Sequence, residues 1–172
     1  MSDDLARRLA AGEASAYRAL YDLHGPLLYR TALRLLGNSE DAQDAVQEVF
    51  MAIVRGRERL TEVLNLKAYL FASLRHVVGR MLRSRRAGEA ALEGHRGVAS
   101  PPGLKATDDH PSPWDLAARL PLEQREVLAL KIHGELTFKE IAAVCGVSPN
   151  TAASRYRYAL EKLKALLEPR QC

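Results

Sequence analysis

The sequence predicts an all-α protein made of two small helical domains, and three observations indicate this fold class. Apolar residues recur at helical spacing along the chain, whereas the two-residue alternation typical of half-buried strands is absent. Gly and Pro gather in one stretch instead of marking turns at regular intervals. The chain has 172 residues, of which 47% are hydrophobic, and this suffices for one ordinary domain or two small ones.

The Gly- and Pro-rich stretch divides the chain in two. Between Arg86 and Trp114 few large apolar residues remain, and the helical period is broken. The interrupting residues are Gly88, Gly94, Gly97, Pro101, Pro102, Gly103, Pro111 and Pro113. We therefore predict a first domain at residues 1–86, a flexible linker at 87–115 and a second domain at 116–172.

Helical periodicity and capping residues define the elements of the first domain. Gly25-Pro26 precedes a strongly apolar segment that Gly37-Asn38 closes, and Ser39 is a suitable N-cap for the next helix. The predicted helices are Asp4–Leu9, Ser15–Tyr21, Leu27–Leu36, one that begins at Ser39, and one from Leu66 to about Arg86.

Charge and cysteine content restrict the partners and the compartment. The formal net charge is +4, which suits an acidic partner without requiring one. The two cysteines, Cys145 and Cys172, have no spacing that suggests a disulfide framework, so a reducing cytoplasm fits best. The first residues lack the order of a signal peptide, and no run approaches about 18 apolar residues. We expect neither export nor membrane insertion.

The helix that begins at Ser39 has two faces. One arc is apolar and predicts core: Ala42, Val46, Val49, Phe50 and Ile53. The opposite arc is acidic and polar: Glu40, Asp41, Asp44, Gln47 and Glu48. A solvated helix face is the simplest interpretation of the second arc, and by itself this arc does not indicate a binding site.

A basic segment follows. No acidic residue occurs between Glu62 and Glu89, and this interval contains Lys67, Tyr69, Phe71, Arg75, His76, Arg80, Arg83, Arg85 and Arg86. Guanidinium groups interleaved with rings can neutralise phosphates and stack on unpaired bases, a combination that suits single-stranded DNA. The alternative is a basic surface helix with Tyr69 in the core, and we predict Phe71 to be core under either interpretation.

The second domain carries a helix-turn-helix pattern. Thr137 and Glu140 form a capping box, and Gly146 suits the left-handed turn between two helices. Ser148 caps the second helix, with Pro149 in its first turn. This geometry directs the start of the second helix into a DNA major groove, which nominates Asn150, Thr151, Ser154, Arg155 and Arg157. We expect packing roles for Tyr156, Leu160, Leu163 and Leu167.

The order of acidic helix, basic aromatic helix, linker and helix-turn-helix resembles the extracytoplasmic-function sigma factors of bacterial RNA polymerase. Four segments carry the resemblance: DAQDAVQEVF at 41–50, KAYLF at 67–71 and on to Arg83, LP at 120–121 with QREV at 124–127, and EIA at 140–142 and on to Arg155. The resemblance implies a cytoplasmic factor that directs the polymerase to promoters and starts transcription.

The resemblance also implies a role for each segment. Asp41, Asp44, Gln47 and Glu48 would lie on the helix that docks against the clamp helices of the largest polymerase subunit. The minus-10 promoter element would be engaged, and its melting assisted, by Lys67, Tyr69, Arg75, His76, Arg80, Arg83, Arg85 and Arg86. The minus-35 element would be bound by Thr137, Lys139, Ser148, Asn150, Thr151, Ser154, Arg155 and Arg157. Family members commonly have an anti-sigma protein, and we expect one here.

Some positions depart from the family pattern. Tyr69, His76 and Arg80 stand where the family commonly has Trp, Asn and Asp. In the recognition helix, Asn150, Ala152 and Ala153 replace the common Gly, Val and Lys. We therefore expect a distinctive minus-35 preference.

Other classes of function fit less well. The histidines have no metal-ligand spacing, and Asp108, Asp109 and His110 are best interpreted as a solvated linker cluster. No phosphate loop or nucleophile motif occurs, so we expect no enzyme, metal or cofactor. Two alternatives stay open: a sigma mimic that sequesters an anti-sigma factor, and a stand-alone helix-turn-helix regulator of duplex DNA.

Overall fold

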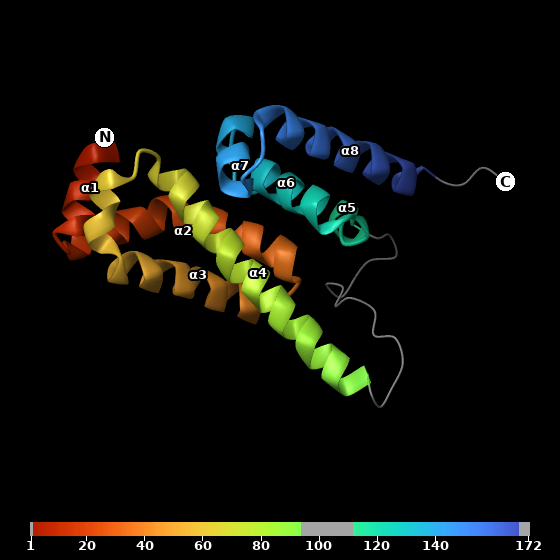
Figure 1. The fold of residues 1–172 in the computed structure, drawn as a ribbon, viewed down its shortest axis with the longest axis horizontal. Coiled ribbons are helices and arrows are strands. Elements are labelled where there is room, and N and C mark those ends of the chain that lie inside the picture. The colour runs from red at the N-terminus through yellow and green to blue at the C-terminus, as the bar shows by residue number, and fades with distance from the viewer. Residues whose placement is uncertain (1, 94–111, 169–172) are drawn as a thin grey trace.

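A computed structural model describes residues 2–93 and 112–168. Every regular element in these two ranges is a helix (Figure 1). The all-α prediction is thus confirmed. Most of the predicted linker, residues 94–111, lies outside the described ranges.

The first half contains four α-helices and one 3₁₀ helix. They are α1 (Ser2–Ala10), α2 (Ala14–Leu36), α3 (Ser39–Arg55), η1 (Arg57–Glu62) and α4 (Leu66–Glu93). The helix α2 packs against both α3 and α4, and α1 packs against η1. These helices enclose an apolar core in which the Phe71 side chain is fully buried, as predicted.

The helix α2 corrects one prediction, because it continues through Gly25-Pro26 instead of starting after it. Pro26 has no backbone N–H and so lacks one helical hydrogen bond. The buried face of α2 nevertheless extends on both sides of it, with Leu20 and Leu28 both fully buried. Apolar packing on each side therefore keeps the two segments in one helix.

The start of α3 differs by one residue from the prediction. Asn38, rather than Ser39, is the N-cap, and its side-chain oxygen accepts a hydrogen bond from the Asp41 backbone N–H at 2.8 Å. Gly37 precedes it with φ of 80°, a left-handed conformation that suits glycine, and ends α2. The predicted apolar arc of α3 is buried at Ala42, Val46, Val49 and Ile53, whereas Phe50 is only half-buried.

The helix limits around the predicted linker also differ from the sequence prediction. The helix α4 runs past the predicted boundary at Arg86 to Glu93, and α5 (Pro113–Ala117) begins before residue 116. Alanines support the extension of α4 because they are strong helix formers. A capping box between Ser112 and Asp115 fixes the start of α5. The sequence prediction missed both because these segments carry few large apolar residues.

The second half contains α5, α6 (Leu122–Ile132), α7 (Phe138–Cys145) and α8 (Pro149–Leu167). The predicted capping box is present: the Glu140 N–H donates to Thr137 Oγ1 at 3.2 Å, and the Thr137 N–H donates to Glu140 Oε2 at 2.8 Å. Gly146 has φ of 67°, and Ser148 Oγ accepts from the Thr151 N–H at 3.0 Å. The helix-turn-helix, formed by α7 and α8, is therefore confirmed.

The two halves are packed together. The helix α7 lies against α4, and α6 lies against α2 (Figure 1). One core cluster includes residues of both halves, among them Phe71 of α4 and Leu130 of α6. A smaller cluster belongs to the second half alone and consists of Leu116, Ala117, Leu120, Leu128, Ala159 and Leu163.

Candidate functional site

The amino-terminal end of α8 presents a polar surface. Ser148, Asn150 and Thr151 are exposed there, and Lys139 of α7 is exposed in the same helix-turn-helix. Ala152 is fully buried and fixes this end of α8 against the domain. The arrangement is the one that allows a recognition helix to enter a major groove with its first residues toward the bases.

Several predicted minus-35 residues also have partners within the protein. The Arg155 guanidinium lies 3.2 Å from the Glu123 carboxylate of α6, and its side chain is only 24% exposed. The Thr137 and Ser148 hydroxyls accept backbone N–H groups as caps. Arg157 is exposed, with its guanidinium carbon 5.5 Å from the centroid of the Tyr158 ring. Asn150 and Arg157 are thus more accessible to DNA than Arg155.

The predicted acidic and basic helices contact each other directly. The Arg80 guanidinium of α4 pairs with the Glu48 carboxylate of α3, and Arg85 pairs with Asp41. The hydrogen bond from the Asn38 side chain and then the Arg85 guanidinium lower the pKa of Asp41, against an opposing effect of burial. The sequence analysis assigned these four side chains to two different partners, whereas the structure joins them in ion pairs.

The other residues of the basic set contact the second half, the core or solvent. The Arg75 Nε lies 2.7 Å from Glu126 Oε1, and the Lys67 ammonium donates to the Glu135 backbone carbonyl at 2.8 Å. His76 and Arg83 line a cavity of about 290 Å³ that α6 also borders. Tyr69 is half-buried and packs against the core, which was the alternative interpretation of this residue. Arg86 is exposed.

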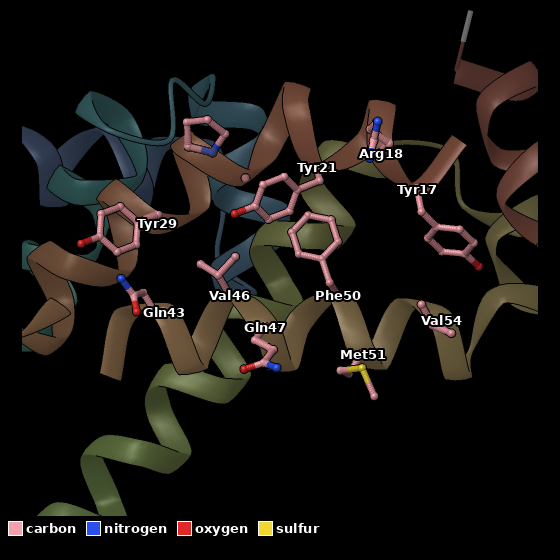
Figure 2. A pocket seen from close by; sticks show the side chains of 12 residues that line it. Tyr17, Arg18, Tyr21, Tyr29, Gln43, Val46, Gln47, Phe50, Met51 and Val54 are labelled. Carbon is pink, nitrogen blue, oxygen red and sulfur yellow. The ribbon is translucent and has the colours of Figure 1, made fainter. Parts of the chain in front are cut away.

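An apolar groove of about 770 Å³ lies between α2 and α3 (Figure 2). Figure 2 shows the Tyr21 and Phe50 rings together in its centre, with ring centroids 5.2 Å apart. Met51 and Tyr21 are 50% and 55% exposed, so the groove carries large apolar side chains in contact with solvent. Gln47 lies along the groove on α3.

The sequence analysis missed this groove because it considered only two arcs of α3. Phe50, which the sequence analysis placed in the apolar arc, forms an apolar stripe along the groove with Met51 and Val54, which it placed in neither arc. Exposed apolar residues on that stripe were the available signal, since large exposed apolar patches mark interaction sites. Of the predicted polymerase set, Asp44 and Gln47 are exposed, whereas Asp41 and Glu48 are held by the arginines of α4.

A second apolar groove, of about 630 Å³, lies beside the carboxyl-terminal part of α8. Leu160 and Leu167 line it and are 42% and 52% exposed, so the packing role predicted for these two side chains is wrong. Leu163 is buried in the second-half cluster, as expected. Tyr156 packs against both core clusters.

Residues 2–93 and 112–168 hold no group of three or more His, Cys, Asp or Glu side chains that could bind a metal ion. Asp108, Asp109 and His110 lie outside those ranges. No helix in the described part of the chain combines the length and apolarity that crossing a membrane requires.

Comparison with known proteins identifies the family. The model of sigma-70 region 2 matches residues 20–88, and that of sigma-70 region 4 matches residues 114–163. The chain is 31% identical over 164 residues to the ECF sigma factor SigL of Mycobacterium tuberculosis, covering 92% of this chain and 93% of SigL. It is 32% identical over 144 residues to EcfG of Rhodopseudomonas palustris, covering 83% and 80% of the two chains.

Solved structures of sigma factors are also similar to this chain. Sigma factor RpoE of Bartonella quintana, in complex with the anti-sigma factor NepR, superposes with a TM-score of 0.73 and 26% identity, covering 90% of this chain and 98% of RpoE. CnrH, in complex with the cytosolic domain of CnrY, superposes with a TM-score of 0.72 and 25% identity over 99% of both chains. The matches favour promoter-directed initiation over either alternative. The chain belongs to the extracytoplasmic-function sigma factors, non-enzymatic proteins that direct bacterial RNA polymerase to promoters.

Proposed function

We propose that the first half of this sigma factor binds core polymerase and the minus-10 element, while the second half binds the minus-35 element. Core polymerase is a bacterial cytoplasmic enzyme, so we place the chain in that compartment. The observation that carries the proposal is the separation of three chemically distinct surfaces: an apolar groove on α2 and α3, a row of cations on α4, and a polar helix start on α8.

The groove is the proposed polymerase contact. Its exposed apolar side chains would gain free energy by leaving water, at about 25 cal/mol per Å² buried. Gln47 lines the groove, and the exposed Asp44 on the same helix supplies a further polar contact of the rim. Asp41 and Glu48 then act within the protein, by orienting the arginines of α4. This assignment refines the predicted polymerase set of Asp41, Asp44, Gln47 and Glu48.

The cations of α4 are the proposed minus-10 contacts. Arg83 and Arg86 are exposed and can meet phosphates directly. Arg80 and Arg85 are held by carboxylates, which fixes their direction and reduces the entropy lost on binding. Tyr69, although half-buried, is the aromatic side chain of the set that offers a ring for base stacking.

The second half is the proposed minus-35 reader. Asn150 is exposed at the helix start and can form two hydrogen bonds to adenine, whereas Arg157 can pair with guanine or a phosphate. We also propose a protein inhibitor, since two similar chains, RpoE and CnrH, were solved in complex with the anti-sigma factor NepR and with CnrY.

A binding experiment tests the polymerase assignment. Affinity for purified core polymerase is measured by fluorescence anisotropy for wild type, Asp44→Arg, Met51→Glu and the control Asp4→Arg. Asp4 lies on α1 and is not among the residues that line the groove, and its substitution changes the charge by the same amount as Asp44→Arg. We expect Asp44→Arg and Met51→Glu to bind at least about tenfold more weakly, equivalent to about 1.4 kcal/mol, and the control to bind normally. Equal affinities for all four proteins would refute the assignment.

A further inference from the structure

Arg155 differs from the other cations of the recognition helix α8 in being half-buried. Its side chain is 24% exposed, and its Nη2 lies 3.2 Å from Glu123 Oε2 of α6. Among the residues that the structure describes, Arg155 has no second ion pair. A guanidinium carries five N–H donors in a rigid plane, so one carboxylate leaves donors for another acceptor. Arg155 is therefore held on one side and available on the other.

The position of Arg155 along α8 indicates which acceptor that is. Thr151 and Arg155 are four residues apart and share one side of the helix. Asn150 and Arg157 are seven residues apart and share a different, exposed side. When the start of a recognition helix enters the major groove, its exposed side faces the bases and its flanks face the sugar-phosphate strands. Arg155 thus lies on a flank, where a backbone phosphate is the acceptor within reach.

The helix α6 presents Glu123 from a fixed frame. It packs against α8, and its Val127 and Leu130 side chains are buried. Glu123 is the second residue of α6, one turn before Val127, and its side chain is 68% exposed. The Arg155–Glu123 pair therefore lies at the surface, where DNA can approach it. A carboxylate in the first turn also stabilises a helix through its dipole, which is the simplest alternative role of Glu123.

We infer that Glu123 is a positioning residue for promoter recognition, because it holds the Arg155 guanidinium in the direction of a backbone phosphate at the minus-35 element. This role deepens the proposed function of the second half and rests on it. Glu123 contacts Arg155 and not the bases, so it strengthens DNA binding through the arginine alone.

Removal of the Glu123 charge has two opposing effects on DNA binding. The carboxylate repels phosphates, so its loss strengthens binding where charge alone matters. Positioning has the opposite sign, because an arginine that is already oriented loses less entropy on binding, which corresponds to roughly two- to tenfold in affinity for one side chain. At about 0.15 M salt the Debye length is about 8 Å, which screens the repulsion but not the ordering of the side chain. Positioning therefore dominates at that salt concentration.

Four single variants and one double variant isolate this role. Glu123→Gln removes the charge and keeps the side-chain shape, and Glu123→Asp keeps the charge. Glu168→Gln is the matched control, because it causes the same charge change and breaks an ion pair, Lys164–Glu168, at the carboxyl-terminal end of α8. Arg155→Gln, alone and combined with Glu123→Gln, shows whether Glu123 acts through Arg155. Circular dichroism and urea denaturation report the folding and stability of each variant separately from DNA binding.

Anisotropy gives the affinity of each full-length protein for two fluorescein-labelled duplexes, one from binding-site selection and one scrambled, at several salt concentrations. We expect Glu123→Gln to bind both duplexes roughly three- to tenfold more weakly than wild type, with a reduced salt slope. Arg155→Gln should lose at least as much affinity and reduce the salt slope by about 0.9. The double variant should bind no more weakly than Arg155→Gln. Glu123→Asp should recover most of the affinity, and Glu168→Gln should bind no more weakly than wild type.

Several outcomes would overturn the positioning role of Glu123. Equal or tighter DNA binding by Glu123→Gln would do so, and lower stability with unchanged DNA affinity would leave Glu123 only its effect on the α6 dipole. An equal loss on the Arg155→Gln background, or a loss that Glu168→Gln reproduces, would show that Glu123 does not act through Arg155.

Failure of the proposed function gives a different result. A wild-type protein that binds the two duplexes equally would refute sequence reading by the second half. The contribution of Glu123 would still be measured in that case, because a phosphate contact is present on both duplexes. Absence of any duplex binding by wild type would overturn both the proposed minus-35 role and the positioning role.

Discussion

Arg85 of α4 donates hydrogen bonds to the Asp41 carboxylate of α3 and to the Leu36 backbone carbonyl at the end of α2, the latter at 3.0 Å. One guanidinium therefore connects three helices of the first half. Arg80 and Glu48 repeat the link between α3 and α4 further along both helices. The proposed polymerase helix and the proposed minus-10 helix are thus fixed in one register.

Asp41→Asn should weaken this link. The pair is partly exposed, with side-chain exposures of 24% and 38%, so solvent screening limits the expected loss of unfolding free energy to about 0.5–1 kcal/mol. Urea denaturation at neutral pH measures it, with Asp44→Asn on the exposed side of α3 as the control. Equal losses for both variants would mean that the Arg85 contact contributes nothing specific.

Gly146→Ala should destabilise the second half through backbone strain. Gly146 has φ of 67°, and a Cβ added there meets nothing within 4 Å, so steric clash with neighbours adds no cost. The left-handed conformation costs a residue with a side chain roughly 1–2 kcal/mol. Urea denaturation should show a loss in that range. An unchanged midpoint would indicate that the turn relaxes at no cost.

Acidification should destabilise the folded protein through two histidines. Burial and then the Lys67 charge lower the pKa of His24, and burial and then the Arg34 and Arg30 charges lower the pKa of His133. Below about pH 6.5 the unfolded chain therefore binds protons that these folded histidines resist. Their stabilisation is present above that pH and is lost as the pH falls through the lowered folded values.

Urea denaturation between about pH 8 and 5 checks this dependence. Wild type should lose unfolding free energy below pH 6.5, and the double variant His24→Gln and His133→Gln should show a shallower slope. His76→Gln is the control, because His76 is exposed on α4. The same slope in all three proteins would assign the pH dependence to other groups.

Asn150→Ala and Arg157→Ala should weaken promoter binding in different ways. Loss of a base contact at Asn150 should cost about 1–3 kcal/mol on the preferred minus-35 sequence and relax selectivity at one base pair. Loss of a phosphate contact at Arg157 should lower affinity for all sequences and reduce the salt slope by about 1. Anisotropy on duplexes from binding-site selection, at several salt concentrations, separates the two. Identical salt and sequence profiles for both variants would contradict these roles.

Local chemistry explains what the sequence predicted correctly. The turn between α7 and α8 depends on a capping box, a left-handed glycine and a Ser-Pro start, all within a few consecutive residues. The apolar arc of α3 could also be predicted from the sequence, because helical periodicity determines which side chains share a face. The wrong break at Gly25-Pro26 shows the limit, since buried residues on both sides of Pro26 outweigh its local preference.

Tertiary arrangement explains what the sequence could not supply. Nothing in the residues around Arg75 indicates that its partner is Glu126, far along the chain, because the pairing depends on how α4 meets the second half. Which acidic residues of α3 form ion pairs and which stay exposed also depends on the position of α4. The groove beside Met51 exists only because α2 and α3 lie side by side.

In vitro transcription tests the central claim most directly. Genomic fragments are transcribed by core polymerase alone, with the wild-type protein, and with the Asp44→Arg variant, and the 5′ ends are mapped. The account predicts discrete start sites that require the protein and are lost or strongly reduced with the variant. An absence of protein-dependent start sites, with core polymerase shown to be active on a control factor, would contradict it.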